Sequence, residues 1–328
     1  MNRHLQKLVC ESTSTTAIIN SQVIQSLWSG YGQIIKVQLQ GGQISSAILK
    51  MIRLPNQVEH PRGWNSNFAH QRKVKSYEIE QNWYRQWSRN CDENCRVAHC
   101  YSANSVENEH VLVLEDLDLA GYSLRKTELN ANQAKCCLRW LANFHAQFLG
   151  VEPNGLWQIG TYWHLATRPD ELNATLDKRL QQAAARIDDE LNNCQYKTFV
   201  HGDAKVANFC FSQDGTKVAV VDFQYVGGGC GMKDVAYFLG SCLDEQACFQ
   251  WQSELLESYF TALSQALTRL QKNVDFSALK TEWLAMFPLA WADFHRFVSG
   301  WAPNHHKINA YSQAMVEKVL ESFESGKI

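Results

Sequence analysis

The sequence predicts an α+β fold, in which a small β-rich lobe precedes a larger and mainly helical lobe. Apolar and polar residues alternate through residues 35–40 and again through 47–51, which is typical of two half-buried strands. Gly41-Gly42 lies between these segments and favours a tight turn. The apolar spacing becomes helical from about residue 71 to 90, and the later chain is mainly helical apart from a predicted hairpin at residues 208–222.

The first lobe is predicted to be a sheet with one helix. Its return strand directs Leu49 toward the core and Lys50 to the opposite face. After the helix, the run Val-Leu-Val-Leu at 111–114 predicts a short buried strand. We therefore expect a lobe at residues 1–117, with a sheet of the five-stranded type, and a helical lobe at residues 118–328.

Composition narrows the class of protein. The chain has 328 residues, is 45% hydrophobic and carries a formal net charge of −2. This length suffices for one large core or two smaller ones, and the near-neutral charge gives no sign of a nucleic-acid partner. Neither a secretion signal nor an apolar stretch of bilayer length is found, so we expect no membrane partner and a cytoplasmic location.

Eleven cysteines are expected to be reduced thiols, since no secretion signal accompanies them. One cluster, formed by Cys91, Cys95, His99 and Cys100, contains residue types that bind zinc. Its spacing matches no common structural zinc pattern, so packing of small apolar side chains is the simpler interpretation.

Two motifs carry the chemistry, HGDAKVAN at residues 201–208 and VDFQ at 221–224. Asp214-Gly215 between them favours a hairpin turn. Asn208 and Asp222 lie equally far from the turn glycine, so a regular hairpin places them side by side at its open end. An amide oxygen and a carboxylate are ligands that Mg²⁺ accepts, and the two residues predict a magnesium site.

Asp203 lies in a loop five residues before Asn208. A carboxylate there can accept the proton of an attacking hydroxyl while Asn208 binds metal on the phosphate side. Phosphoryl transfer requires this arrangement of a positioned nucleophile and neutralised charge. The alternative is that both residues only cap turns, but two motifs in this order favour the catalytic interpretation.

Together the two motifs resemble those of the aminoglycoside phosphotransferase / choline kinase-like superfamily, and the Asp-Phe-Gln form is closest to its ecdysteroid-kinase-like branch. The resemblance implies a bilobal, protein-kinase-like fold, with ATP and Mg²⁺ as cofactors. It also implies that Asp203 is the catalytic base and that Asn208 and Asp222 are the magnesium ligands. Lys205 would contact the transferred phosphate.

The resemblance extends into the first lobe. Ala47-Ile48-Leu49-Lys50 resembles the strand that ends in the phosphate-binding lysine, and Glu80, followed by Trp83-Tyr84, resembles its partner glutamate. Glu78 is a competing candidate for that partner. The alternative interpretation of Lys50 is an exposed lysine of a strand, and that of Glu80 is an ordinary solvated carboxylate on a helix.

Two further features complete the predicted nucleotide site. Gly30 and Gly32, ahead of the strand at 35–40, resemble a phosphate-binding loop, although two glycines in a surface turn would look the same. Backbone groups of Glu115 and Leu117 resemble the hinge that contacts adenine.

Two residues of the helical lobe match superfamily signatures as well. We interpret His145 as a satisfied core residue. Asp234 resembles a supporting aspartate of the superfamily, and an N-cap role explains it equally well.

The acceptor is predicted to be a small hydroxylated molecule. No Ala-Pro-Glu motif occurs, and only eleven residues separate Asp222 from Asp234, too few for the peptide platform of a protein kinase. The segment 287–311 is the candidate lining, through Trp291, Asp293, Arg296 and Trp301. Packing of a helical core explains the same residues equally well. A nucleotide-binding regulatory module and an aminoglycoside-type kinase are the alternative functions.

Overall fold

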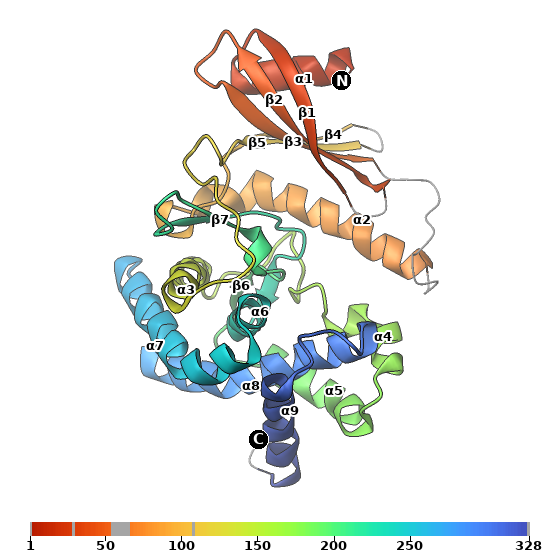
Figure 1. Cartoon of the computed structure of the whole chain (residues 1–328), viewed down its shortest axis with the longest axis vertical. Coiled ribbons are helices and arrows are strands. Elements are labelled where there is room, and N and C mark those ends of the chain that lie inside the picture. The colour runs from red at the N-terminus through yellow and green to blue at the C-terminus, as the bar shows by residue number, and fades with distance from the viewer. Residues whose placement is uncertain (1, 28–29, 54–65, 107–108, 327–328) are drawn as a thin grey trace.

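The computed structural model describes residues 2–27, 30–53, 66–106 and 109–326. Its first part is an antiparallel sheet with the order β1-β2-β3-β5-β4, and helices dominate the second part, which lies below the sheet in Figure 1. The strands of this sheet are β1 (Ala17–Ser26), β2 (Gly32–Gln40), β3 (Ser46–Arg53), β4 (Cys100–Val106) and β5 (Glu109–Glu115). The predicted α+β fold with a β-rich first lobe is confirmed. The division at residues 117 and 118 stays a prediction.

Helix α1 (Arg3–Thr13) packs on one face of the sheet, and this helix was not predicted. Leu5 and Val9 are buried against an apolar face of the sheet that includes Val37, Leu49 and Val113. The first lobe therefore has two described helices rather than the single helix expected, because α2 (Ser66–Asn82) packs below the sheet. The helical turns of α2 continue through Trp83–Trp87 in wider, π-helical form.

Strand β1 was also missed, and it changes the position of the predicted glycine loop. Eight of its ten residues are exposed, so the strand lacks the apolar alternation that reveals a half-buried strand. Consequently Gly30 lies between the first two strands and Gly32 begins β2, rather than both preceding the first strand.

The second part of the chain consists of helices with two small sheets. Its helices are α3 (Ala131–Gln147), α4 (Pro169–Ala174), α5 (Lys178–Asn192), α6 (Met232–Cys242), α7 (Glu245–Arg269), α8 (Phe276–Trp301) and α9 (Ala310–Glu324). Its strands are β6 (Thr198–Val200), β7 (Phe209–Phe211), β8 (Val218–Val220) and β9 (Gly227–Gly229), paired as β6-β9 and β7-β8. Among the described residues, no helix combines the length and apolar character needed to span a membrane.

The predicted hairpin at 208–222 is formed by β7 and β8, but its register differs by one residue from the prediction. Phe209 pairs with Val220, so Asn208 lies opposite Val221, whose N–H donates to the Asn208 carbonyl at 3.1 Å. Asp222 is the next residue. The hairpin still brings the two predicted metal ligands to the same end, one step apart rather than directly opposite.

Candidate active site

The carboxylate of Asp203 is held by contacts at both oxygens. Lys205 Nζ lies 2.9 Å from Oδ2, and the Tyr237 hydroxyl donates to Oδ1 at 3.0 Å. Asn208 Nδ2 donates to the Asp203 carbonyl at 2.7 Å. Asp203, Lys205 and Asn208, which were predicted from one motif, therefore form one hydrogen-bonded group, and Tyr237 from α6 adds a contact that the sequence did not indicate.

A buried aspartate fixes the loop that carries Asp203. The Asp234 carboxylate accepts from the backbone N–H of His201 at 2.5 Å and of Gly202 at 2.9 Å. His145 Nε2 lies 3.2 Å from the same carboxylate, and its Nδ1 lies 2.7 Å from the Tyr259 hydroxyl. Asp234 therefore binds the loop rather than capping α6, whose N-cap is Gly231. His145 is fully buried with both ring nitrogens bonded, in agreement with its interpretation as a core residue.

The loop geometry depends on glycine at position 202. Its φ is +77°, and a Cβ would lie 2.1 Å from the Tyr225 carbonyl oxygen. The adjacent His201 side chain links the two motifs, because its Nε2 lies 3.0 Å from the Val221 carbonyl oxygen. A carbonyl can only accept, so Nε2 carries the proton, and Nδ1 accepts the Asp203 N–H at 3.2 Å.

Asp222 lies among positive charges and has an unusual backbone conformation. Its φ of 71° is uncommon outside glycine and is a form of strain found at functional sites. Oδ1 accepts from Lys50 Nζ at 3.1 Å and from Gln224 Nε2 at 2.8 Å, and Lys73 Nζ in turn bonds Gln224 at 2.7 Å. Burial favours the neutral acid, but the charges of Lys50, Lys205 and Lys73 outweigh it and hold the pKa of Asp222 well below its usual range.

The donor set fits Mg²⁺. Asn208 commits its amide nitrogen to Asp203, which leaves its oxygen for a ligand, and the Asp222 carboxylate is ionised with 31% of its side chain exposed. Mg²⁺ is commonly held by one or two protein oxygens and completed by water and phosphate. Within the described ranges, no cluster of three or more His, Cys, Asp or Glu that could hold a metal is found. Cys91, Cys95, His99 and Cys100 are therefore not found as such a cluster.

Lys50 joins the two parts of the chain. Its Nζ lies 2.8 Å and 2.7 Å from the two carboxylate oxygens of Glu80 in α2, as well as contacting Asp222. Burial opposes the charged ammonium, but the charges of Asp222 and Glu80 raise the pKa of Lys50 overall. Glu80, rather than Glu78, is the partner of Lys50.

Beside this group the Phe223 ring stacks on Trp83, with the ring centroids 4.4 Å apart. This contact packs the VDFQ motif against the end of α2.

The predicted adenine hinge lies at the end of β5. The Glu115 N–H already bonds the His99 carbonyl at 2.8 Å, and the Leu117 carbonyl accepts from Tyr122 N at 2.8 Å. No hydrogen bond of the Leu117 N–H is found within the described chain, and the residue is 4% exposed. Gly30 has φ +76°, whereas Gly32 is required because a Cβ there would lie 1.9 Å from the Met51 carbonyl oxygen. Phosphate binding by the two glycines stays a prediction.

The four predicted acceptor residues are mostly internal. Trp291, Asp293 and Arg296 are 2%, 1% and 0% exposed. Arg296 Nη2 bonds Asp293 at 2.8 Å, and Trp163 Nε1 donates to the same carboxylate at 3.0 Å. Trp301 is partly buried and stacks on Phe297, with centroids 6.0 Å apart. Among the described residues no contact of these side chains with Asp203 is found, and core packing explains the three buried ones, whose ion pair lies inside the core.

Arg296→Ala is expected to lower the free energy of unfolding by about 3–5 kcal/mol, because it leaves the buried Asp293 carboxylate without its counter-charge. Urea denaturation measures the change. Lys280→Ala is the matched control on the same helix, since its partner Glu257 is 66% exposed, and it should cost about 1 kcal/mol or less. Equal, small losses in both variants would contradict the buried-pair interpretation.

Three residues near the candidate site were missed by sequence reasoning. Lys73 contacts Gln224, Tyr237 contacts Asp203, and Lys307 packs on the Tyr237 ring with Nζ 4.7 Å from its centroid. No motif marks them, because each lies in a different element and only the fold brings them to the site.

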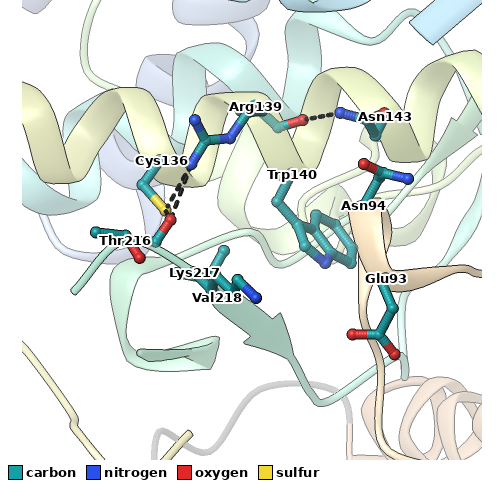
Figure 2. A pocket seen from close by; sticks show the side chains of 9 residues that line it. All are labelled: Glu93, Asn94, Cys136, Arg139, Trp140, Asn143, Thr216, Lys217 and Val218. Carbon is teal, nitrogen blue, oxygen red and sulfur yellow. Dashed lines mark hydrogen bonds between the residues drawn. The ribbon is translucent and has the colours of Figure 1, made fainter. Parts of the chain in front are cut away.

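A hollow of about 340 Å³ occurs elsewhere, where the helical part meets Glu93 and Asn94 (Figure 2). It lies between α3 and the turn end of the β7-β8 hairpin, and its lining comprises Glu93, Asn94, Cys136, Arg139, Trp140, Asn143, Thr216, Lys217 and Val218. None of these is a predicted site residue. Arg139 closes part of the hollow by donating to the Thr216 carbonyl at 2.9 Å.

A β-rich lobe over a helical lobe, with the two motifs joined by a hairpin, defines a kinase-like phosphotransferase. The chain belongs to the phosphotransferase enzyme family, whose sequence profile matches residues 25–272. The predicted membership of the aminoglycoside phosphotransferase / choline kinase-like superfamily is thus confirmed, whereas the ecdysteroid-kinase-like branch stays a prediction. A comparison with curated protein sequences finds no match.

Solved structures agree on the fold. Choline kinase from Cryptosporidium parvum Iowa II has a TM-score of 0.58 at 10% identity, covering 99% of this chain and 97% of that chain. Amicoumacin kinase hAmiN, in complex with AMP-PNP, Ca²⁺ and Ami, has a TM-score of 0.56 at 14% identity, covering 99% and 96%. The microcompartment-associated aminopropanol kinase has a TM-score of 0.52 at 14% identity, covering 99% and 98%. At these identities the likeness shows the fold alone.

Proposed function

We propose that this protein transfers the γ-phosphate of ATP, bound with Mg²⁺, to a hydroxyl group of a small molecule. The observation that carries the proposal is the hydrogen-bonded group of Asp203, Lys205 and Asn208, which the hairpin joins to Asp222. This group places a base beside a pair of oxygen ligands for metal, as phosphoryl transfer requires.

Each residue has a distinct part in this proposal. Asp203 accepts the proton of the attacking hydroxyl, and Lys205, 40% exposed, offers its charge to the transferred phosphate. Lys50, fixed by Glu80, meets the phosphates of the donor. Asn208 and Asp222 hold Mg²⁺, which neutralises phosphate charge when bound. The N–H of Leu117 is a candidate donor to adenine.

A small acceptor fits the segment that follows Asp222. Residues Gly227–Gly229 form strand β9, which pairs with β6 and is fully buried. This segment is therefore tied into the helical lobe and offers no extended surface for a peptide. Its compactness supports a small molecule, rather than a protein, as the acceptor.

The test is a screen of hydroxylated metabolites by ADP release, with and without Mg²⁺. We expect acceptor-stimulated ADP release that requires Mg²⁺, and a rise in melting temperature when Mg²⁺ and ATP are added together. Binding of Mg²⁺ and ATP without stimulation by any acceptor would instead indicate a nucleotide-binding regulatory module. Aminoglycosides belong in the same panel, and phosphorylation of these polycations alone would identify the other alternative.

A further inference from the structure

Lys307 lies in the segment between α8 and α9, against two aromatic rings beside the catalytic group. Its Nζ is 4.7 Å from the centroid of Tyr237 and 5.2 Å from that of Phe294. The Tyr237 hydroxyl donates to Asp203. A single aromatic ring therefore separates the Lys307 ammonium from the carboxylate proposed as base.

No carboxylate pairs with Lys307 within the described part of the chain, in contrast to Lys50 and Lys205. Lys50 pairs with Glu80 and Asp222, and Lys205 pairs with Asp203. Burial, reinforced by the charge of Lys205, lowers the pKa of Lys307 to about 8 although the Asp203 charge opposes this. A half-buried cation on aromatic faces, without a counter-charge, is suited to an anion supplied by a ligand.

The charges around Asp203 favour the same kind of ligand. The Asp203 carboxylate is accompanied by two ammonium groups, those of Lys205 and Lys307, while Asp222, the other carboxylate that acts on Lys205, is offset by Lys50 and Lys73. Asp293, the carboxylate expected to face the acceptor, is buried in its pair with Arg296. The surroundings of the base therefore attract an anionic acceptor and repel a cationic one.

Building on the proposed function, we propose that the acceptor is a hydroxylated small molecule with a carboxylate or phosphate group, and that Lys307 binds this anionic group. The hydroxyl to be phosphorylated lies at Asp203. Its oxygen forms a bond to the γ-phosphorus while the bond from that phosphorus to the bridging oxygen breaks. The hydroxyl proton passes to Asp203 and ADP leaves with the bonding electrons.

The experiment compares one hydroxylated scaffold in three charge states: a hydroxy acid, its methyl ester and the matching amino alcohol, with a phosphate-bearing analogue as a second anion. The wild-type protein should have the highest kcat/KM for an anion. Lys307→Met should raise the KM for that anion about 10- to 100-fold, the range expected for a charged hydrogen bond, without changing the KM for ATP. Lys307→Gln is the second neutral variant, and Lys280→Met, remote from the site, is the charge-loss control.

A charge-retaining variant and pH add independent readouts. Lys307→Arg should keep the preference for the anion, and Lys307→Glu should reverse it toward the amino alcohol. Asp203, Lys205, Cys242 and His305 are titratable groups that act on Lys307, and Tyr237 is the titratable group on whose ring it packs. Since an anion favours the protonated amine, the KM of wild type for the acid should rise as the pH passes about 8, while the arginine variant should show no such rise.

Each outcome decides the inference. A preference for the ester or the amino alcohol that both neutral variants leave unchanged would overturn it, as would a rise in the KM for ATP alone. If the protein phosphorylates neither these acceptors nor any molecule of the metabolite screen, the proposed function fails. The inference is then decided by the Kd of the hydroxy acid for protein loaded with AMP-PNP and Mg²⁺, which must weaken in Lys307→Met.

Discussion

Replacing Asp203 with asparagine is expected to lower kcat for acceptor phosphorylation about 10²- to 10⁴-fold, the usual contribution of a general base. The amide has the same size and its oxygen can still accept the Tyr237 hydroxyl, which lies 3.0 Å from the carboxylate. Nucleotide binding should therefore persist. Steady-state ADP release measures kcat, and the increase in melting temperature with Mg²⁺ and AMP-PNP measures binding.

Tyr237→Phe is the matched control for this substitution. It removes the hydroxyl that contacts Asp203 but leaves the carboxylate and its contact with Lys205. We expect its kcat to fall by about 10-fold or less, as for loss of one neutral hydrogen bond. Wild-type turnover in Asp203→Asn would refute the assignment of the base.

Replacing Asp222 with asparagine is expected to abolish the magnesium-dependent part of nucleotide stabilisation. A nucleotide at one hundred times its Kd stabilises the wild-type protein by about 2.7 kcal/mol. The magnesium-dependent part of this stabilisation requires a charged metal ligand, and the amide of asparagine is neutral. Melting temperatures with AMP-PNP, in the presence of Mg²⁺ or of EDTA, measure the effect. Since Lys50, Lys205 and Lys73 hold the pKa of Asp222 below its usual range, Asp222 should stay ionised, and the wild-type response should not fall, as the pH approaches about 3.9, where an ordinary aspartate is half protonated.

Asp214→Asn provides the control on the same hairpin. Asp214 lies at the turn and bonds only local groups, Ser212 and Thr216. Its substitution removes one negative charge and should leave the Mg²⁺ response intact. A normal response in Asp222→Asn would show that the metal is held elsewhere.

The sequence predicted the site best where neighbours in the chain are neighbours in space. HGDAKVAN and VDFQ are joined by a short hairpin, so counting from the Asp214-Gly215 turn located Asn208 and Asp222 to within one residue. The prediction was wrong by one residue because Phe209 pairs with Val220. The register of a hairpin depends on the geometry of its turn, which counting residues from the turn does not reveal. Lys50 and Glu80 were predicted from resemblance, and their ion pair is present in the structure.

Prediction failed where the relevant signal is tertiary. Strand β1 is largely exposed and has no apolar alternation to detect. The segment 287–311 contains aromatic and charged side chains that suit either a binding wall or a core, and only packing reveals that Asp293 and Arg296 are internal. Tyr237 and Lys307 reach the Asp203 group from different elements, and no spacing in the sequence links them to it.

The support of the catalytic loop has an evolutionary consequence. Asp234 and His145 hold the loop from the interior of the helical lobe, whereas Lys307 approaches from the connection between α8 and α9. Substitutions in that connection can alter which molecule is selected without loosening the residues that perform the reaction. Proteins that descend from this fold can thus change their acceptor specificity while they keep the same catalytic residues.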